Sequence, residues 1–164
     1  IRITDIDQSG NLKDEKVSPK EIDKKYYLNV GDILFARSGA TVGKNYIHLS
    51  DEKAIYAGYL IKLSLDTDKI NSKYIYHCVN TTEYYKFIKN TKSSGSQPNI
   101  NAKQYSSFNI PLPPLEVQEY IVSILDKFDK LLNDIKEGLP KEIELRQKQY
   151  EYYREKLLSF SKKD

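Results

Sequence analysis

The stretch that decides the fold is the last fifty residues, which run from Leu115 to Asp164 as LEVQEYIVSILDKFDKLLNDIKEGLPKEIELRQKQYEYYREKLLSFSKKD. Its apolar residues recur at alternating spacings of three and four, a narrow seam that requires a second helix to cover it. Gly138-Leu139-Pro140 interrupts the pattern, so we predict two helices joined there, each roughly 30 Å long. A globular domain that ends in such a rod is expected to be one part of an assembly. The seam residues are Gln118, Ile121, Leu125, Phe128, Leu132 and Ile135, followed by Ile143, Tyr150, Tyr153, Leu157 and Phe160.

The rest of the composition favours a soluble, cytoplasmic protein. No apolar run approaches the roughly 20 residues that cross a bilayer, so no membrane partner is expected. A single cysteine, Cys78, excludes an internal disulfide and favours a reducing compartment. The chain starts at Ile1 and contains no Met, so we expect the native N-terminus to lie upstream.

The net charge of +3 is unevenly distributed along the chain. Residues 1–114 carry 16 Lys/Arg and 12 Asp/Glu, whereas residues 115–164 carry 10 and 11. Two stretches, 33–50 and 84–115, contain no acidic residue. Basic stretches without acids suit a polyanion, because each cation placed near a phosphate releases counterions. An ordinary solvated face is the alternative for the same charges.

The pattern of residues 1–114 predicts a mixed α+β domain. Strands are expected at 1–6, 33–36 and 46–49, with one or two more between 54 and 65 and an edge strand at 108–111. A helix is expected from Asn71 or Ser72 to about Lys89, with Tyr85 and Ile88 on its apolar side. Since a proline restrains the residue before it, the next helix should begin after Pro114. The predicted domains are therefore 1–114 and a helical region at 115–164.

None of the motifs that could support catalysis has the complete residues or spacing. The segment Gly39 to Asn45 has three residues between its glycines instead of the four of a phosphate-binding loop, and Asn45 stands where a Mg²⁺-binding hydroxyl belongs. His77 and Cys78 are adjacent, so on a helix they point about 100° apart and make a poor metal pair. We therefore expect no metal site, no cofactor of its own and no enzymatic activity in this chain.

Two loops, Arg37-Ser38-Gly39 and Ser94 to Asn99, combine small residues with side chains of the types that hydrogen-bond DNA. Arg pairs with guanine, and Gln or Asn pairs with adenine, whereas lysines hold phosphates. The alternative is a pair of ordinary turns, with Asn99 capping a short helix at 101–106. The candidate DNA-binding residues are Arg37, Ser38, Gly39, Lys44, Lys86, Lys89, Lys92, Ser94, Gly95, Ser96, Gln97, Asn99 and Lys103.

The order of these motifs resembles the specificity subunit of type I restriction–modification enzymes. The resemblance covers nearly the whole chain, and the order of its motifs carries more weight than any one of them. The residues that carry it are Gly31-Asp32-Ile33-Leu34, Arg37-Ser38-Gly39, Gly43-Lys44, the run from Ser94 to Ile100, the run from Ile110 to Leu115, Gln118, and the helical pattern from Gly138 to Phe160.

The resemblance implies a target recognition domain that reads half of a bipartite double-stranded DNA site. It also implies a helical region that docks the modification subunit, which methylates adenine with S-adenosylmethionine and links to the restriction subunit. One recognition domain and one helical region, where the family usually has two of each, leave open a half-subunit that would homodimerise or the second half of a full subunit. The candidate dimer or partner residues are Ile121, Leu125, Phe128, Leu132, Ile143, Tyr150, Tyr152, Tyr153, Arg154 and Leu157.

Two other functions are compatible with the same sequence. The helices could form a scaffold whose first domain binds protein without reading DNA. RNA binding through exposed tyrosines is a third possibility, although the 14 tyrosines fall mostly at apolar periodic positions. A steep dependence of duplex binding on salt would favour DNA recognition over the scaffold.

Overall fold

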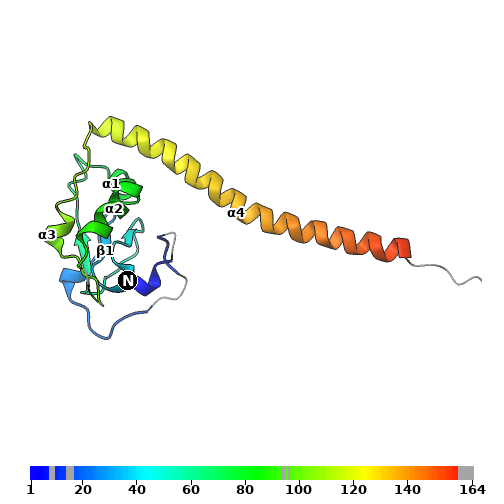
Figure 1. The fold of residues 1–164 in the computed structure, drawn as a ribbon, viewed down its shortest axis with the longest axis horizontal. Helices are drawn as coiled ribbons and strands as arrows, with labels where there is room; N and C mark the ends of the chain where they lie inside the picture. Colours follow the sequence, from blue (N-terminus) through cyan, green and yellow to red (C-terminus); the bar gives the residue numbers. More distant parts are fainter. Residues whose placement is uncertain (8–9, 14–16, 94, 96, 159–164) are drawn as a thin grey trace, which may run out of the picture. The chain divides into compact units, whose positions relative to one another are not determined.

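The computed structural model describes residues 1–7, 10–13, 17–93, 95 and 97–158 (Figure 1). For residues 132–137, 141, 143, 146–147 and 150–158 the description covers the backbone alone. The chain divides into two compact units, Ile1–Val122 and Ser123–Asp164, and each is described by itself. The first unit mixes short helices with a small sheet, so the predicted α+β class is confirmed.

The first unit contains three strands, three α-helices and three short 3-10 helices within the described residues. In chain order the elements are η1 (Ile3–Asp5), η2 (Lys24–Tyr26), β1 (Ile33–Ala36), η3 (Gly39–Thr41), β2 (Asn45–Ile47), β3 (Leu60–Leu63), α1 (Ser72–Cys78), α2 (Thr82–Thr91), α3 (Ala102–Tyr105) and α4 (Leu115–Leu158), which begins here and continues into the second unit.

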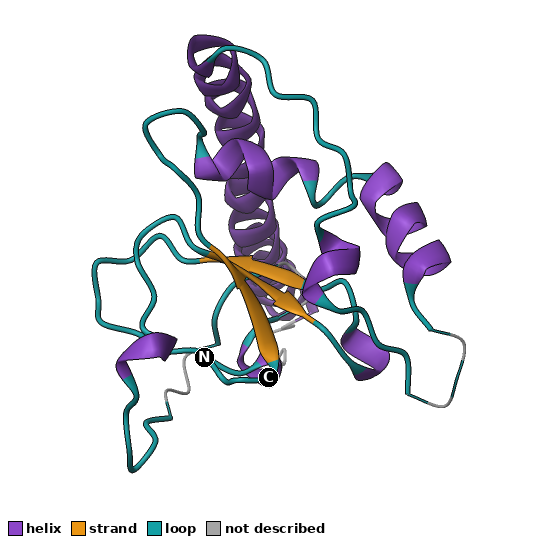
Figure 2. Cartoon of the chain, turned by 90° about the vertical axis from the view of Figure 1, so that its left-hand side faces the viewer, coloured by secondary structure: helices purple, strands orange, loops and turns teal. Residues whose placement is uncertain are grey.

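The sheet is antiparallel, in the order β2-β1-β3, and it appears in Figure 2 as three orange arrows. The middle strand β1 is buried along its whole length, because both faces of the sheet are covered. Ile33 and Phe35 pack with residues of α1 and α2, whereas Leu34 and Ala36 pack with Ile6 and its neighbours on the other side. This double burial explains why the sequence at 33–36 is uniformly apolar instead of alternating.

Two predicted strands are not strands in the structure. Residues 3–5 form η1, because the Asp5 carboxylate accepts the Arg2 N–H at 2.8 Å and pairs with the Arg2 guanidinium at 2.6 Å, which stabilises a tight turn. Residues 108–111 run as irregular chain. There the Pro111 carbonyl accepts the Tyr74 hydroxyl at 2.9 Å, and a proline has no N–H to donate to a ladder.

The single helix predicted over residues 71–89 is two helices. The Thr81 hydroxyl donates to the Cys78 carbonyl at 2.9 Å at the end of α1 and accepts the Tyr84 N–H at 3.3 Å at the start of α2. Because of this break, the residues of α2 that face the core are not those expected from continuing the periodicity of α1. Tyr84 is consequently buried with Ile88, and Tyr85, which the unbroken pattern placed inside, is half exposed.

The last helix begins at Leu115, as predicted, but it is continuous to Leu158 with Pro140 inside it. The prediction of two helices joined at 138–140 is therefore wrong. Proline lacks the N–H for one helical bond and crowds the carbonyl four residues earlier, a disfavoured interior position that a helix can nevertheless pass through. The first eight residues of α4, up to Val122, belong to the first unit.

Candidate nucleic-acid interface

The two acid-free loops are joined to each other by backbone hydrogen bonds. The first loop, 37–44, connects β1 with β2, and the second, 92–101, connects α2 with α3. Ser38 and Asn99 form an antiparallel bridge between them. On either side of the bridge, the Gly39 N–H donates to the Pro98 carbonyl at 2.9 Å, and the Ile100 N–H donates to the Arg37 carbonyl at 2.8 Å. Loops that lie sixty residues apart in sequence thus form one continuous surface.

The second loop is also closed on itself. The Asn99 N–H donates to the Ser93 hydroxyl at 3.0 Å, and the Ser93 N–H donates to the Asn99 carbonyl at 3.2 Å. The short helix that follows is capped by Asn101, whose side chain accepts the Gln104 N–H at 2.9 Å. The alternative in which Asn99 caps this helix is therefore wrong, because the helix begins at Ala102 and Asn101 holds the capping position.

Five of the candidate DNA-binding residues, four predicted phosphate contacts and the predicted base contact Arg37, are exposed cations. Within the part of the chain that the structure describes, their side chains have no ion pair or hydrogen bond, so each charge is available to an anion. Lys44 differs from them, because its ammonium donates to the Ile6 carbonyl. The five available cations are Arg37 after β1, Lys86 and Lys89 on the outer side of α2, Lys92 at its C-cap, and Lys103 on α3.

The candidate base-reading residues lie on the paired loops. Gln97 is exposed, and Ser38 and Asn99 are half-buried at the bridge. Gly39 has a φ of +78°, a conformation that L side chains rarely adopt, and no atom lies within 4 Å of the place where its Cβ would be. Gly95 is equally open, so both glycines leave room for close approach of another molecule. Ser94 and Ser96, also predicted to contact DNA, lie outside the described residues.

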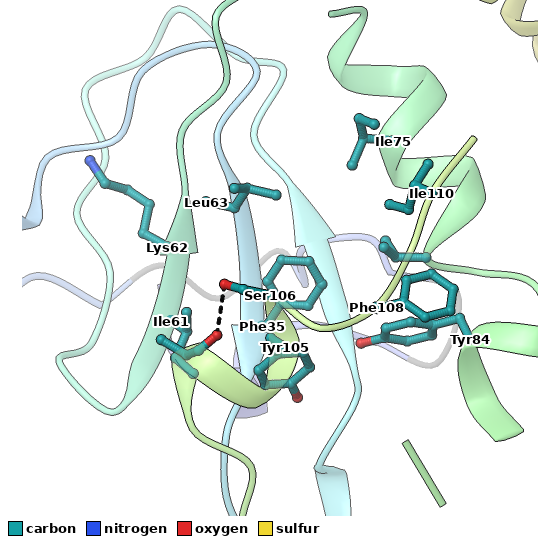
Figure 3. Close-up of a pocket in the computed structure, with 12 residues that line it drawn as sticks. Phe35, Ile61, Lys62, Leu63, Ile75, Tyr84, Tyr105, Ser106, Phe108 and Ile110 are labelled. Carbon is teal, nitrogen blue, oxygen red and sulfur yellow. Dashed lines mark hydrogen bonds between the residues drawn. The ribbon is translucent and has the colours of Figure 1, made fainter. Parts of the chain in front are cut away.

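A largely apolar cavity of about 230 Å³ lies between the sheet, α1, α2 and the segment that includes and follows α3. Figure 3 shows Phe35 of β1 with Tyr84, Tyr105 and Phe108 at this place. The Tyr105 ring packs against that of Phe35 with an interplanar angle of 37° and ring centres 5.0 Å apart. The lining carries no carboxylate, histidine or cysteine side chain.

Among the described residues, no group of three or more His, Cys, Asp or Glu side chains could hold a metal ion. No helix within the same residues is both long and apolar enough to cross a membrane.

The predicted dimer or partner residues on α4 fall into three groups. Ile121 packs against the core of the first unit, so part of the predicted seam covers that unit itself. Leu125 is half-buried and Phe128 is 57% exposed, as is its neighbour Leu131. The other predicted residues have side chains outside the description, and they are Leu132, Ile143, Tyr150, Tyr152, Tyr153, Arg154 and Leu157.

Three residues that hold parts of the first unit together were not singled out for these roles by the sequence. Tyr84 and Tyr105 bind the backbone at the base of the first loop. Gln118, assigned to the helical seam, is 1% exposed: its side chain accepts the Asn71 N–H at 2.9 Å and donates to the Pro113 carbonyl at 2.8 Å. A glutamine at a seam position was the available signal, because polar residues at such positions require buried partners.

Comparison with known proteins identifies similar chains. Residues 4–145 match the family model described as type I restriction modification DNA specificity domain. The specificity subunit of the type I restriction enzyme EcoR124I/EcoR124II of Escherichia coli is 49% identical over 102 residues, 62% of this chain and 25% of that protein. S.HindORF215P of Haemophilus influenzae is 39% identical over 144 residues, 87% of this chain and 36% of that protein.

The fold has a counterpart among solved structures. The crystal structure of the HsdS subunit from Thermoanaerobacter tengcongensis superposes with a TM-score of 0.73 at 18% identity, over 99% of this chain and 43% of that one. The chain therefore spans between 25% and 43% of the length of these relatives.

Proposed function

From the premise that this chain belongs to the family of type I restriction modification DNA specificity domains, we propose that it reads a double-stranded DNA sequence. The bound sequence would direct methylation and restriction by the subunits that carry those activities. The chain itself would act as a non-catalytic component, in the cytoplasm where its DNA target lies. The observation that supports this most directly is the bridge between Ser38 and Asn99, which joins the two acid-free loops.

The paired loops have the two kinds of group that sequence recognition requires. Exposed cations attract phosphates without regard to sequence and fix the position of the protein on the duplex. Exposed amides such as Gln97 form paired hydrogen bonds with an adenine edge, and Arg37 can do the same with guanine. Because the loops are hydrogen-bonded together, these two groups keep a constant separation, which is what reading a fixed series of base pairs demands.

The test of this proposal is selection of binding sites from a library of random-sequence duplexes with the full chain. Recognition predicts that a consensus emerges after a few rounds and that binding to it weakens steeply with salt. The scaffold alternative predicts no enrichment and no salt-dependent binding. Retention of duplexes without any consensus would show a general DNA-binding surface and would contradict sequence reading.

The helical region is proposed to serve assembly. Exposed Phe128 and Leu131 lie three residues apart on one side of α4, an apolar strip that a second helix would cover. A second copy would supply that helix and, by two-fold symmetry, a second recognition domain. In the natural complex a modification subunit, which would bind S-adenosylmethionine, is proposed to dock on the last part of the helix.

Tyr152 and Arg154 are the proposed anchors of that docking, since Tyr and Arg are enriched in interface centres. The combined change Tyr152→Ala and Arg154→Ala should reduce co-purification of the modification subunit. Unchanged co-purification would show that docking lies elsewhere on the chain.

A further inference from the structure

Two tyrosine hydroxyls close the base of the first recognition loop. Ala36 ends β1 and Gly43 lies just before β2. These two residues are the points where the chain enters and leaves the loop, and together they form what we call its neck. The Gly43 N–H donates to the Ala36 carbonyl at 3.2 Å and to the Tyr105 hydroxyl at 3.1 Å. The same Tyr105 hydroxyl donates to the Ala36 carbonyl at 2.7 Å, and the Tyr84 hydroxyl donates to the Gly43 carbonyl at 2.9 Å. Both sides of the neck are thereby fixed by side chains from outside the loop.

The backbone at Gly43 can sit in this place because it carries no side chain. Its φ is +90°, and a Cβ there would lie 2.7 Å from Cγ2 of Ile88 on α2. Such a distance is shorter than van der Waals contact permits. The backbone at Gly43 consequently packs directly against α2, where the Tyr84 hydroxyl donates a hydrogen bond to its carbonyl.

The helices that hold this neck also carry the two ends of the second loop. Tyr84 belongs to α2, which ends at Thr91 where the second loop begins. Tyr105 belongs to α3, which begins at Ala102 where that loop ends. Together with the bridge between Ser38 and Asn99, this arrangement ties the two loops at their tips and at their bases.

Burial further favours the neutral form of both hydroxyls, which is the form that can donate. Desolvation raises the pKa of Tyr84 far above its ordinary value, and the neighbouring Tyr105 adds to the effect. Burial likewise raises the pKa of Tyr105 to about 12. Figure 3 shows both rings in the apolar cavity beside Phe35 and Phe108.

We infer that Tyr84 and Tyr105 are positioning residues for DNA recognition: their hydroxyls hold the first loop in register with the second, so that Arg37 and Gln97 reach base edges at a fixed separation. This inference rests on the proposed function. Neither tyrosine needs to touch DNA for it to hold, because each acts through the backbone of Gly43.

The test uses Tyr84→Phe and Tyr105→Phe in the full chain, which remove one oxygen each and keep the ring packing. Affinity is measured for the duplex enriched from the random library and for a scrambled duplex of the same composition. We expect the ratio of the two affinities to fall about tenfold, as expected when recognition side chains lose their pre-organisation. Exchange of the Gly39 and Ile100 amides, which form the inter-loop bonds, should accelerate in both variants.

Tyr74→Phe is the matched control. Tyr74 is 7% exposed and its hydroxyl donates to a backbone carbonyl, that of Pro111, at 2.9 Å, but this bond lies away from the loops. The control should lose thermal stability to a similar degree, while its affinity ratio and the exchange at Gly39 and Ile100 stay unchanged.

Unchanged ratios in both loop variants, with a wild type that discriminates between the duplexes, would overturn the inference. A fall of the ratio in Tyr74→Phe as large as in the loop variants would also overturn it, since the effect would then follow from stability alone. A wild type without duplex preference contradicts the proposed function instead, and amide exchange still decides whether the tyrosines couple the loops.

Discussion

The exposed cations around the paired loops predict how steeply DNA binding depends on salt. Lys86, Lys89, Lys92 and Lys103 have no side-chain partner among the described residues, so up to four phosphates can be neutralised. With a slope of about −0.9 per phosphate, the logarithm of the affinity should fall with the logarithm of salt at about −3.6. This corresponds to roughly 150-fold weaker binding when salt rises from 50 to 200 mM.

Substituting one of these cations measures its contribution to the salt dependence of DNA binding. Lys92→Ala should make the slope shallower by about 0.9 and should weaken cognate and scrambled duplexes alike, because phosphates carry no sequence information. The assay is a fluorescence anisotropy titration of both duplexes at four or more salt concentrations. Lys25→Ala is the control, because the Lys25 ammonium is already paired with Asp23 at 2.8 Å. Equal slopes for Lys92→Ala, Lys25→Ala and the unaltered chain would refute the assignment of this face to DNA.

Three further results are expected. Gln118→Ala should destabilise the first unit by about 1–3 kcal/mol in thermal or urea unfolding, because the part-buried Asn71 N–H loses the acceptor that the buried Gln118 supplies; a change within experimental error would contradict this role. Phe128→Asp combined with Leu131→Asp should turn a dimer into a monomer in sedimentation velocity, and an unaltered chain that is already monomeric at tens of micromolar would rule out the proposed pairing. The raised folded-state pKa of Tyr105, about 12 against an unfolded value of roughly 10, favours the neutral ring. Its contribution is therefore complete below pH 10 and lost as the pH rises through 12, so urea midpoints should fall less over this range in Tyr105→Phe than in the unaltered chain.

Local chemistry explains which elements could be predicted from the sequence. The strand at 33–36 was predicted correctly because an uninterrupted apolar run is what a doubly covered strand requires. The start of the last helix was predicted correctly because Pro113 and Pro114 cannot continue a helix that precedes them, and the chain is free to turn helical after them. The membership of the family was indicated by the order of motifs, and the comparisons confirm it.

The errors arise where tertiary contacts override a local pattern. The helix over residues 71–89 was predicted as one because its apolar positions nearly keep phase, but the Thr81 hydroxyl forms bonds to both sides and divides it. Pro140 was interpreted as the end of a helix, since a proline usually is, and the structure continues through it. Such outcomes depend on the net free energy of a whole helix, which a single residue does not reveal.

The geometry of the candidate site was only partly accessible from sequence. Two acid-free loops could be recognised by composition, but the bridge between Ser38 and Asn99, which brings them together, is visible only in the structure. The part played by Tyr84 and Tyr105 could not be predicted, because their hydroxyls bind Gly43, more than forty residues away for one and more than sixty for the other. No periodicity or local motif reports a contact at that separation.

The central claim is that the paired loops read base sequence, and Gln97→Ala tests it most directly. Gln97 is exposed at the second loop, and an amide that pairs with an adenine edge contributes about 1–3 kcal/mol of discrimination. The measurement is the ratio of affinities for the selected and scrambled duplexes at one salt concentration, with Gln149→Ala, an exposed glutamine of α4, as the control. The account predicts that Gln97→Ala lowers this ratio at least fivefold (about 1 kcal/mol) while the control leaves it unchanged. Equal weakening of both duplexes, or no change in either, would contradict it.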